Sequence, residues 1–286
     1  MSRTALVITH TGREEALVAA EEARRELEAA GLVVVDETEI AGAGDAAGVD
    51  FAVVLGGDGT ILRAAELTRA PGVPILAINL GHVGFLAEAE REDISQAVRR
   101  LAAGDFVVEE RGTLDVLVLR PGEDPVDDWA LNEATLEKAV PGRMVEVAVE
   151  VDGLPVSTFG CDAVVLSTAT GSTAHAFSAG GPVIWPDVDA TLLVPVSAHA
   201  LFARPLVVGP ASVLAVEVLA RSSVPAMLSC DGRRTNELPC GTRVEVRRSD
   251  VPVRLARLTE APFSERLVRK FSLDVEGWRG RANGGR

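Results

Sequence analysis

A glycine-rich turn with an acidic residue inside it is the part of the chain best suited to chemistry. The turn, Gly56-Gly57-Asp58-Gly59-Thr60, follows the apolar run Phe51–Leu55 and precedes the helical pattern Ile61–Ala70. Its glycines let the backbone approach a ligand and offer N–H donors to phosphate, and we expect Thr60 to cap the helix. Phosphates would repel Asp58 unless it binds a metal or accepts a proton from an attacking hydroxyl. The turn therefore predicts phosphoryl transfer onto an alcohol with Mg²⁺ neutralising the donor, the alternative being a plain strand-to-helix turn.

Two further segments place small polar side chains directly after apolar runs. Thr168–His175 follows the run Ala163–Leu166 and is suited either to hydrogen-bonding a polar ligand or to capping a short helix. Asn132-Glu133 closes the run that begins at Trp129, and it is suited either to binding the hydroxyls or amide of a ligand or to ending a strand in solvent. The residues alone leave these alternatives open.

The composition excludes several other classes of site and partner. Of the 286 residues, 28 are Lys or Arg and 42 are Asp or Glu, and the net charge of −14 argues against a nucleic-acid partner. Neither Lys138 nor Lys270 follows a glycine, so the chain has no Walker A loop. The three cysteines lack the spacing of a zinc site or a disulfide framework. No signal-peptide core or membrane span stands out, so we expect a cytoplasmic protein with no membrane partner.

The elements that must position these residues change in type along the chain. Up to about residue 107, apolar runs that predict strands alternate with amphipathic patterns that predict helices, which is typical of a parallel sheet with crossover helices. The predicted strands are Thr4–Thr9, Leu32–Val35, Phe51–Leu55 and Pro74–Ile78, and the predicted helices are Arg13–Ala30, Ile61–Ala70 and Asp93–Ala103.

The rest of the chain is rich in short strand patterns separated by turn residues, with a single helical pattern over Phe263–Phe271. The predicted strands are Leu114–Leu119, Met144–Val151, Ala163–Leu166, Val213–Leu219, Val224–Ser229, Val244–Val246 and Val251–Leu255. The fold class we expect is therefore α/β plus all-β. Its first domain covers residues 1–110 and carries the glycine turn, and a β-rich domain covers residues 111–261.

Taken together, the motifs of this chain resemble those of the NAD kinase family over most of its length. The glycine turn alone is weak evidence, because diacylglycerol kinases, sphingosine kinases and phosphofructokinases carry similar turns. The full set in this order is specific: Gly56–Thr60, Asn79–Leu86, Leu131–Glu133, Ser167–His175, Ser178–Pro182, Pro195–Leu206 and Ser229–Gly232.

The resemblance implies a kinase that phosphorylates the 2′-hydroxyl of the adenosine ribose of NAD and forms NADP. It also implies ATP or inorganic polyphosphate as the phosphoryl donor, Mg²⁺ or another divalent metal, and Asp58 as the base or orienting group. The residues it assigns to NAD are Asp58, Gly59, Phe85, Asn132, Glu133, Asp162, Thr173, Ala174, His175 and Ser178. The residues expected at the donor phosphates are Gly56, Gly57, Gly59 and Thr60, and we add Arg63 because it lies one helical turn further on.

Within that set, the resemblance places Asn132 and Glu133 at the adenine end and the other ribose, and Asp162 at the nicotinamide amide. Phe85, Thr173 and Ala174 would line the adenine pocket, and Ser178 would contact the dinucleotide. The family fold implies a Rossmann-like domain followed by a β-sandwich-like domain, with the C-terminal segment of about residues 262–286 returning to the first. Family members assemble as dimers or tetramers, so we expect a homodimer or homotetramer.

Two positions depart from the family pattern. Ala169 stands where the family usually has proline, and His175 stands where it usually has a tyrosine that packs on a ribose of NAD. Because histidine titrates near neutrality, we expect NAD affinity to change between about pH 6 and pH 8.

Two other functions remain as alternatives. A lipid or sugar kinase shares the glycine turn, but the acidic charge of the chain and its second polar loop do not favour it. A non-catalytic NAD-binding regulator would keep the pocket without turnover, and the intact turn around Asp58 argues against that.

Overall fold

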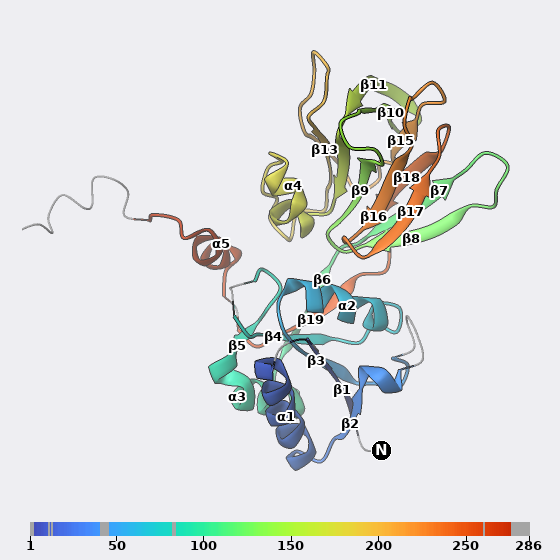
Figure 1. Cartoon of the computed structure of the whole chain (residues 1–286). Coiled ribbons are helices and arrows are strands. Elements are labelled where there is room, and N and C mark those ends of the chain that lie inside the picture. The colour runs from blue at the N-terminus through green and yellow to red at the C-terminus, as the bar shows by residue number, and fades with distance from the viewer. Residues whose placement is uncertain are drawn as a thin grey trace, which may run out of the picture. The chain divides into compact units, whose positions relative to one another are not determined.

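The computed structural model describes residues 3–10, 12, 14–40, 46–81, 84–259 and 261–275. It divides the chain into two compact units, whose elements Figure 1 labels along the chain. Unit 1 comprises Met1–Glu110 and Val253–Arg286, and unit 2 comprises Arg111–Pro252. The sequence placed the return to unit 1 at about residue 262. In the structure β19 (Val253–Arg257) begins that return, because it pairs with the sheet of unit 1.

Unit 1 is built on a sheet with the strand order β2-β1-β3-β4-β19-β6, to which β5 is added by pairing with β4. Its strands are β1 (Thr4–Thr9), β2 (Val33–Asp36), β3 (Phe51–Leu55), β4 (Ile75–Asn79), β5 (Ala89–Glu90), β6 (Val107–Arg111) and β19. Strand β1 runs parallel to β2 and β3, and β3 runs parallel to β4. Parallel neighbours need long crossover connections, and helices supply them here.

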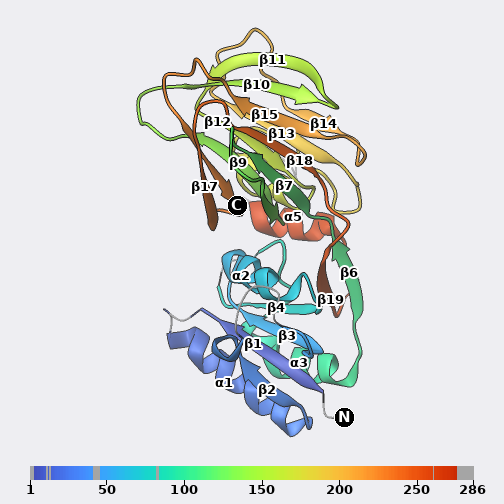
Figure 2. The same ribbon diagram turned by 90° about the vertical axis from the view of Figure 1, so that its right-hand side faces the viewer.

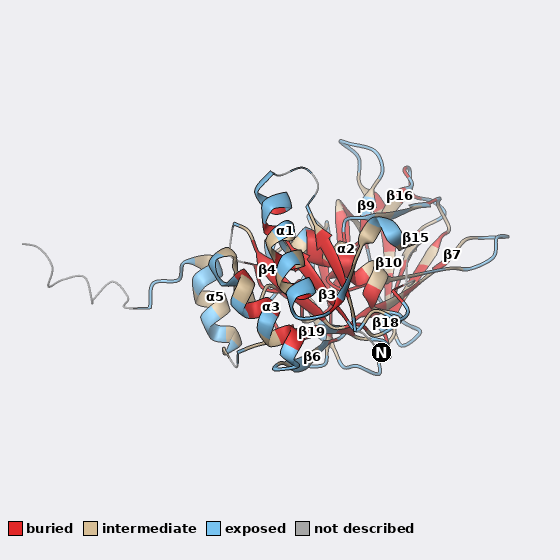
Figure 3. Ribbon diagram, turned by 90° about the horizontal axis from the view of Figure 1, so that it is seen from below, coloured by how far each residue is buried: buried red, intermediate tan, exposed pale blue. Residues whose placement is uncertain are grey.

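Helices cover both faces of this sheet. Figures 1 and 2 show α1 (Glu14–Ala29) and α3 (Ile94–Ala103) on one face and α2 (Asp58–Thr68) on the other. Leu27 of α1 and Val98 of α3 join Val53 and Leu55 of β3 in one apolar cluster. Every residue of β3 and β4 is buried, and Figure 3 shows these strands covered while the outer sides of α1 and α3 face solvent. Strands β3 and β4 are apolar along their length because helices bury both faces of the sheet.

The short elements of unit 1 are the 3-10 turns η1 (Glu37–Glu39) and η2 (Arg91–Asp93) and the helix α5 (Phe263–Phe271). The sequence predicted α5 with the same bounds. None of the helices described combines the length and the apolar composition that crossing a bilayer requires.

Unit 2 is a sandwich of two six-stranded antiparallel sheets, with the orders β11-β10-β15-β18-β7-β8 and β14-β13-β12-β9-β16-β17. Val116 and Val147 of the first sheet pack with Val164 and Leu228 of the second in a single core cluster. The strands are β7 (Leu114–Leu119), β8 (Val126–Ala130), β9 (Glu133–Lys138), β10 (Val145–Val151), β11 (Leu154–Cys161), β12 (Ala163–Ser167), β13 (Thr191–Val196), β14 (Leu206–Val208), β15 (Leu214–Val218), β16 (Ala226–Cys230), β17 (Arg234–Leu238) and β18 (Arg243–Arg248).

The outer face of the second sheet carries the helical turns η3 (Gly171–Thr173) and α4 (His175–Ser178). Val165 of β12 and Leu192 of β13 pack there against Ala176 and Ile184. A Rossmann-like parallel domain, a β-sandwich and a C-terminal return confirm the expected fold class.

Candidate active site

The glycine turn opens directly into helix α2. The helix begins at Asp58 with Gly57 at its N-cap, so the expectation that Thr60 caps the helix is wrong. Thr60 lies inside the first turn and is 7% exposed. A Cβ on Gly56 would fall 2.4 Å from the Thr60 hydroxyl oxygen, so the buried threonine occupies space that only glycine leaves free. The backbone N–H of Gly56 donates to the Ile78 carbonyl at 3.0 Å and that of Thr60 to the Gly57 carbonyl at 2.9 Å, so neither is free for a donor phosphate, and the contact of the rest of the turn with phosphate stays a prediction.

The carboxylate of Asp58 packs against the backbone of Gly84. A Cβ on Gly84 would lie 2.4 Å from Oδ1 of Asp58. That oxygen is buried, and no described residue donates a hydrogen bond to it. A buried acceptor without a donor costs about 1–3 kcal/mol, and a substrate hydroxyl that donated to Oδ1 would remove this cost. Of the Asn79–Leu86 motif that contains Gly84, His82 and Val83 lie outside the described residues.

Two other residues expected at the site have partners within unit 1. Phe85 is 6% exposed, and its ring packs on two phenylalanine rings of α5 at centroid distances of 5.8 and 5.7 Å. Nη2 of Arg63 donates to the Thr9 carbonyl at 2.6 Å and pairs with Glu37 at 3.0 Å. Arg63 therefore joins α2 to the end of β1, and its contact with donor phosphates stays a prediction.

In unit 2, the Asn132-Glu133 pair and the loop after β12 form one cluster. The backbone N–H of Thr168 donates to the Asn132 carbonyl at 2.9 Å, and the Thr168 hydroxyl donates to the Leu131 carbonyl at 2.6 Å. A Cβ on Gly171 would fall 2.1 Å from the Asn132 carbonyl oxygen, so only glycine allows this approach. Thr173 ends η3, Ala174 lies between η3 and α4, and His175 and Ser178 begin and end α4.

Glu133 is the buried acid of this cluster. It is 8% exposed, it accepts a hydrogen bond from the backbone of His175, and its Oε2 has no donor among the described residues. Burial and the charge of Asp231 raise the pKa of Glu133 to about 8. The carboxyl is therefore protonated at neutral pH and offers a ligand a donor as well as an acceptor. His175 lies beside it, with Nδ1 3.3 Å from the Thr135 hydroxyl.

Asp231 organises the Asn132-Glu133 pair, a role that the sequence did not reveal. Its carboxylate accepts from the backbone N–H groups of Leu131, Asn132 and Glu133 at 2.9, 2.7 and 3.3 Å. Nη2 of Arg234 lies 3.4 Å from it. Asp231 adopts a φ of 54°, which the Asp-Gly turn signal at Asp231-Gly232 could have suggested, but nothing in the sequence pointed to the backbone that it holds.

Asp162 lies apart from this cluster. It precedes β12 while Thr168 follows it, and the six residue steps between them along the strand correspond to roughly 20 Å. Asp162 pairs with Lys138 and accepts a hydrogen bond from Ser197, and the Lys138 ammonium holds the pKa of the carboxyl below its usual range. The structure therefore does not bring Asp162 together with Asn132 and Glu133.

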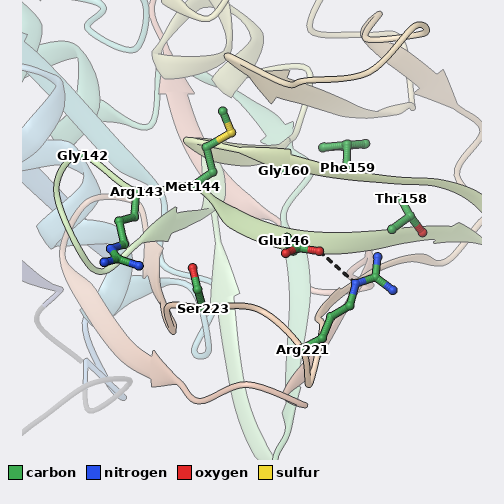
Figure 4. Close-up of a pocket in the computed structure, with 9 residues that line it drawn as sticks. All are labelled: Gly142, Arg143, Met144, Glu146, Thr158, Phe159, Gly160, Arg221 and Ser223. Carbon is green, nitrogen blue, oxygen red and sulfur yellow. Dashed lines mark hydrogen bonds and ion pairs between the residues drawn. The ribbon is translucent and has the colours of Figure 1, made fainter.

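A separate cavity of about 600 Å³ lies over β10 and β11, and Arg221 pairs with Glu146 inside it at 2.9 Å (Figure 4). Its lining residues are Gly142, Arg143, Met144, Glu146, Thr158, Phe159, Gly160, Arg221 and Ser223. None of the residues expected to bind NAD or the phosphoryl donor lines it.

Comparisons with known proteins match both units. A family model described as the ATP-NAD kinase N-terminal domain matches residues 5–106, and one described as the ATP-NAD kinase C-terminal domain matches residues 131–258. The chain belongs to the NAD kinase family. The NAD kinase of Thermobifida fusca is 54% identical over 303 residues, covering 98% of this chain and 93% of that one. NAD kinase 2 of Streptomyces coelicolor is 55% identical over 293 residues, covering 97% of each.

Solved structures of NAD kinase family members share the fold. An NAD kinase from Archaeoglobus fulgidus in complex with ATP superposes with a TM-score of 0.76 at 27% identity, covering 95% of this chain and 100% of that one. Yeast NADH kinase complexed with NADH gives a TM-score of 0.82 at 21% identity, covering 100% and 89%, a likeness of fold alone. The family resemblance predicted from the sequence is confirmed.

Proposed function

We propose that this enzyme transfers a phosphoryl group from ATP to the 2′-hydroxyl of the adenosine ribose of NAD, forming NADP. Membership of the NAD kinase family supports this proposal. The structural observation that carries it is the buried Oδ1 of Asp58, which has no donor among the described residues and lies in a glycine turn at the start of a helix.

In this proposal Asp58 accepts or orients the proton of the 2′-hydroxyl. The ribose oxygen forms a bond to the γ-phosphorus, the bond from that phosphorus to the β–γ bridging oxygen breaks, and ADP leaves. The proton goes to Oδ1 of Asp58. Backbone N–H groups of Gly57 and Gly59, together with the helix dipole, would favour the negative charge that the phosphates bring.

A divalent metal is part of the proposal. Mg²⁺ in phosphoryl-transfer enzymes takes one or two carboxylates and completes its shell with substrate phosphates and water. The described residues contain no grouping of three His, Cys, Asp or Glu side chains that would hold a metal without such phosphates. The phosphates of the donor and water would hold the ion, which would neutralise donor charge there and leave Oδ1 of Asp58 to the acceptor hydroxyl. Inorganic polyphosphate would present the same phosphate chemistry as ATP.

We assign the rest of NAD to the polar cluster of unit 2 and to Phe85 and Gly59 of unit 1. Asn132 and the protonated carboxyl of Glu133 would bind the adenine end and a ribose, because both present donors and acceptors from a buried position. The remaining contacts are proposed for Thr173, Ala174, His175, Ser178 and, at the nicotinamide amide, Asp162. We also propose a homodimer or homotetramer in the cytoplasm, a reducing compartment that suits three free cysteines.

The test is formation of NADP from NAD, ATP and Mg²⁺, followed with an NADP-specific dehydrogenase. Asp58→Asn should lower kcat by about 100-fold or more while NAD binding, measured by calorimetry, persists. Glu92→Gln, which changes an exposed acid of unit 1, is the matched control and should keep full activity. Absence of NADP with the unmodified enzyme, or full activity of Asp58→Asn, would refute the proposal.

A further inference from the structure

The carboxylate of Glu88 is buried within unit 1 and surrounded by donors. Its side chain is 1% exposed. Oε1 accepts from the backbone N–H of Leu258 at 2.9 Å, from that of Thr259 at 2.8 Å and from the Thr259 hydroxyl at 2.9 Å. Oε2 accepts from Nη1 of Arg257 at 3.2 Å and from Nη2 of Arg266 at 3.1 Å. Donors from β19, the residues after it and α5 therefore converge on one acid.

The negative charge of Glu88 compensates the positive charges of two arginines, Arg257 and Arg266, whose side chains are largely buried beside it. The side chains of Arg257 and Arg266 are 7% and 15% exposed. Burial and the neighbouring charge of Arg257 lower the pKa of Arg266. Arg257 also pairs with Glu109, whereas Arg266 pairs with Glu88. Removing one partner of a buried pair leaves an uncompensated charge, which costs far more than losing a surface pair.

A segment of five residues connects this acid to Asp58. At its start, Gly84 lies so close to Asp58 that a Cβ would fall 2.4 Å from Oδ1. Phe85 packs on two rings of α5, and the Leu86 carbonyl accepts from Nη1 of Arg257 at 3.1 Å. At its end, the same arginine and α5 are bonded to Glu88. The far end of the segment is thus held by these bonds to the Glu88 side chain and by the hydrogen bond from the Glu88 backbone N–H to the Ala77 carbonyl at 2.8 Å.

We propose that Glu88 is a positioning residue for the phosphoryl transfer. It fixes the segment from Gly84 to Glu88 against β19 and α5, and through Gly84 it holds the carboxylate of Asp58 in the orientation that meets the acceptor hydroxyl. The inference rests on the proposed function of Asp58. Glu88 has no direct part in the reaction, so its loss should act on kcat through the placement of Asp58. A displacement of about 1 Å of a reacting group costs up to about 100-fold in rate.

A double-mutant cycle between Glu88→Gln and Asp58→Asn separates this positioning from general support of the fold. With Asp58 present, Glu88→Gln should lower kcat for NADP formation by about 10-fold to 100-fold. In the Asp58→Asn background the same substitution should change kcat less than about twofold, because no base is left to misorient. Unchanged kcat with Asp58 present, or equal losses in both backgrounds, would overturn the proposal.

Arg266→Gln is the second variant if Glu88→Gln reduces the folded fraction. It leaves Glu88 bonded to Arg257, Leu258 and Thr259 and removes only the bond that Glu88 receives from α5. It should lower kcat several-fold, again only with Asp58 present, and a loss in both backgrounds or in neither overturns the positioning role.

The control for this cycle is Glu26→Gln. It removes an ion pair with Arg99 at 3.1 Å, between α1 and α3, and should leave kcat unchanged. An unmodified enzyme that makes no NADP refutes the proposed function itself. An unmodified enzyme that makes NADP while folded Glu88→Gln keeps its kcat refutes only the positioning role.

Discussion

Replacing Gly84 with alanine is the most direct test of the contact between the Asn79–Leu86 motif and Asp58. The added Cβ would lie 2.4 Å from Oδ1 of Asp58, which is 1.0 Å short of the 3.4 Å at which ordinary contact begins. The clash of the added methyl group falls on the Asp58 carboxylate. Asp58 must therefore move by about 1 Å, which should lower kcat by about 100-fold.

The same substitution should lower the free energy of unfolding by about 1–3 kcal/mol, the usual cost of an overpacked methyl group. Gly81→Ala is the matched control, because a Cβ on this glycine of the same motif meets no described residue within 4 Å. Steady-state NADP formation, calorimetric NAD binding and thermal unfolding of both variants check the expectation. Wild-type kcat in Gly84→Ala would show that the Asp58 carboxylate is not held by this contact or does not act in the reaction.

Two further predictions concern the cluster in unit 2. Because the folded state raises the pKa of Glu133 to about 8, it holds a proton that the unfolded chain releases near pH 4.5, so the free energy of unfolding should fall by up to about 5 kcal/mol between these pH values. In urea unfolding, Glu137→Gln, an exposed change on the same strand, should have a lower free energy of unfolding at pH 8.5 than at pH 5. Glu133→Gln should not show this fall, and an equal fall in both variants would contradict the prediction. Asp231→Asn should raise the KM for NAD and cost about 1–3 kcal/mol in unfolding experiments, because an amide cannot accept from the three backbone N–H groups that the carboxylate serves. An unchanged KM would remove Asp231 from the site.

Much of the fold could be predicted from local pattern, because burial on two faces leaves a plain record in the sequence. Phe51–Leu55 is apolar at every position and lies at the centre of a parallel sheet, and Thr4–Thr9 and Phe263–Phe271 have the predicted bounds. Strands with one polar face were harder to predict from the sequence. Arg234–Leu238 and Glu133–Lys138 carry charged residues that hide their strand character, and both pair with β16.

The assignment of a strand to a sheet was also beyond the sequence. The sequence predicted the strand Val251–Leu255 within the β-rich domain, but the observed strand, Val253–Arg257, pairs with β4 in unit 1. A hydrophobic pattern records which residues are buried and does not record which partner buries them. The domain to which such a strand belongs is decided by long-range pairing.

The sequence by itself determined the residue types of the site and the backbone that the glycine turn requires. Gly56, Asp58 and Thr60 stand in one short segment, so their chemistry is readable without a fold. Only the tertiary structure decided what lies against them. Gly84 beside Asp58, Thr168 on the Asn132 carbonyl and Asp231 beneath the Asn132-Glu133 backbone are contacts between segments distant along the chain. Such contacts depend on how the elements pack, which local spacing does not encode. They bury the Asp58 oxygen that has no donor among the described residues, and they raise the pKa of Glu133.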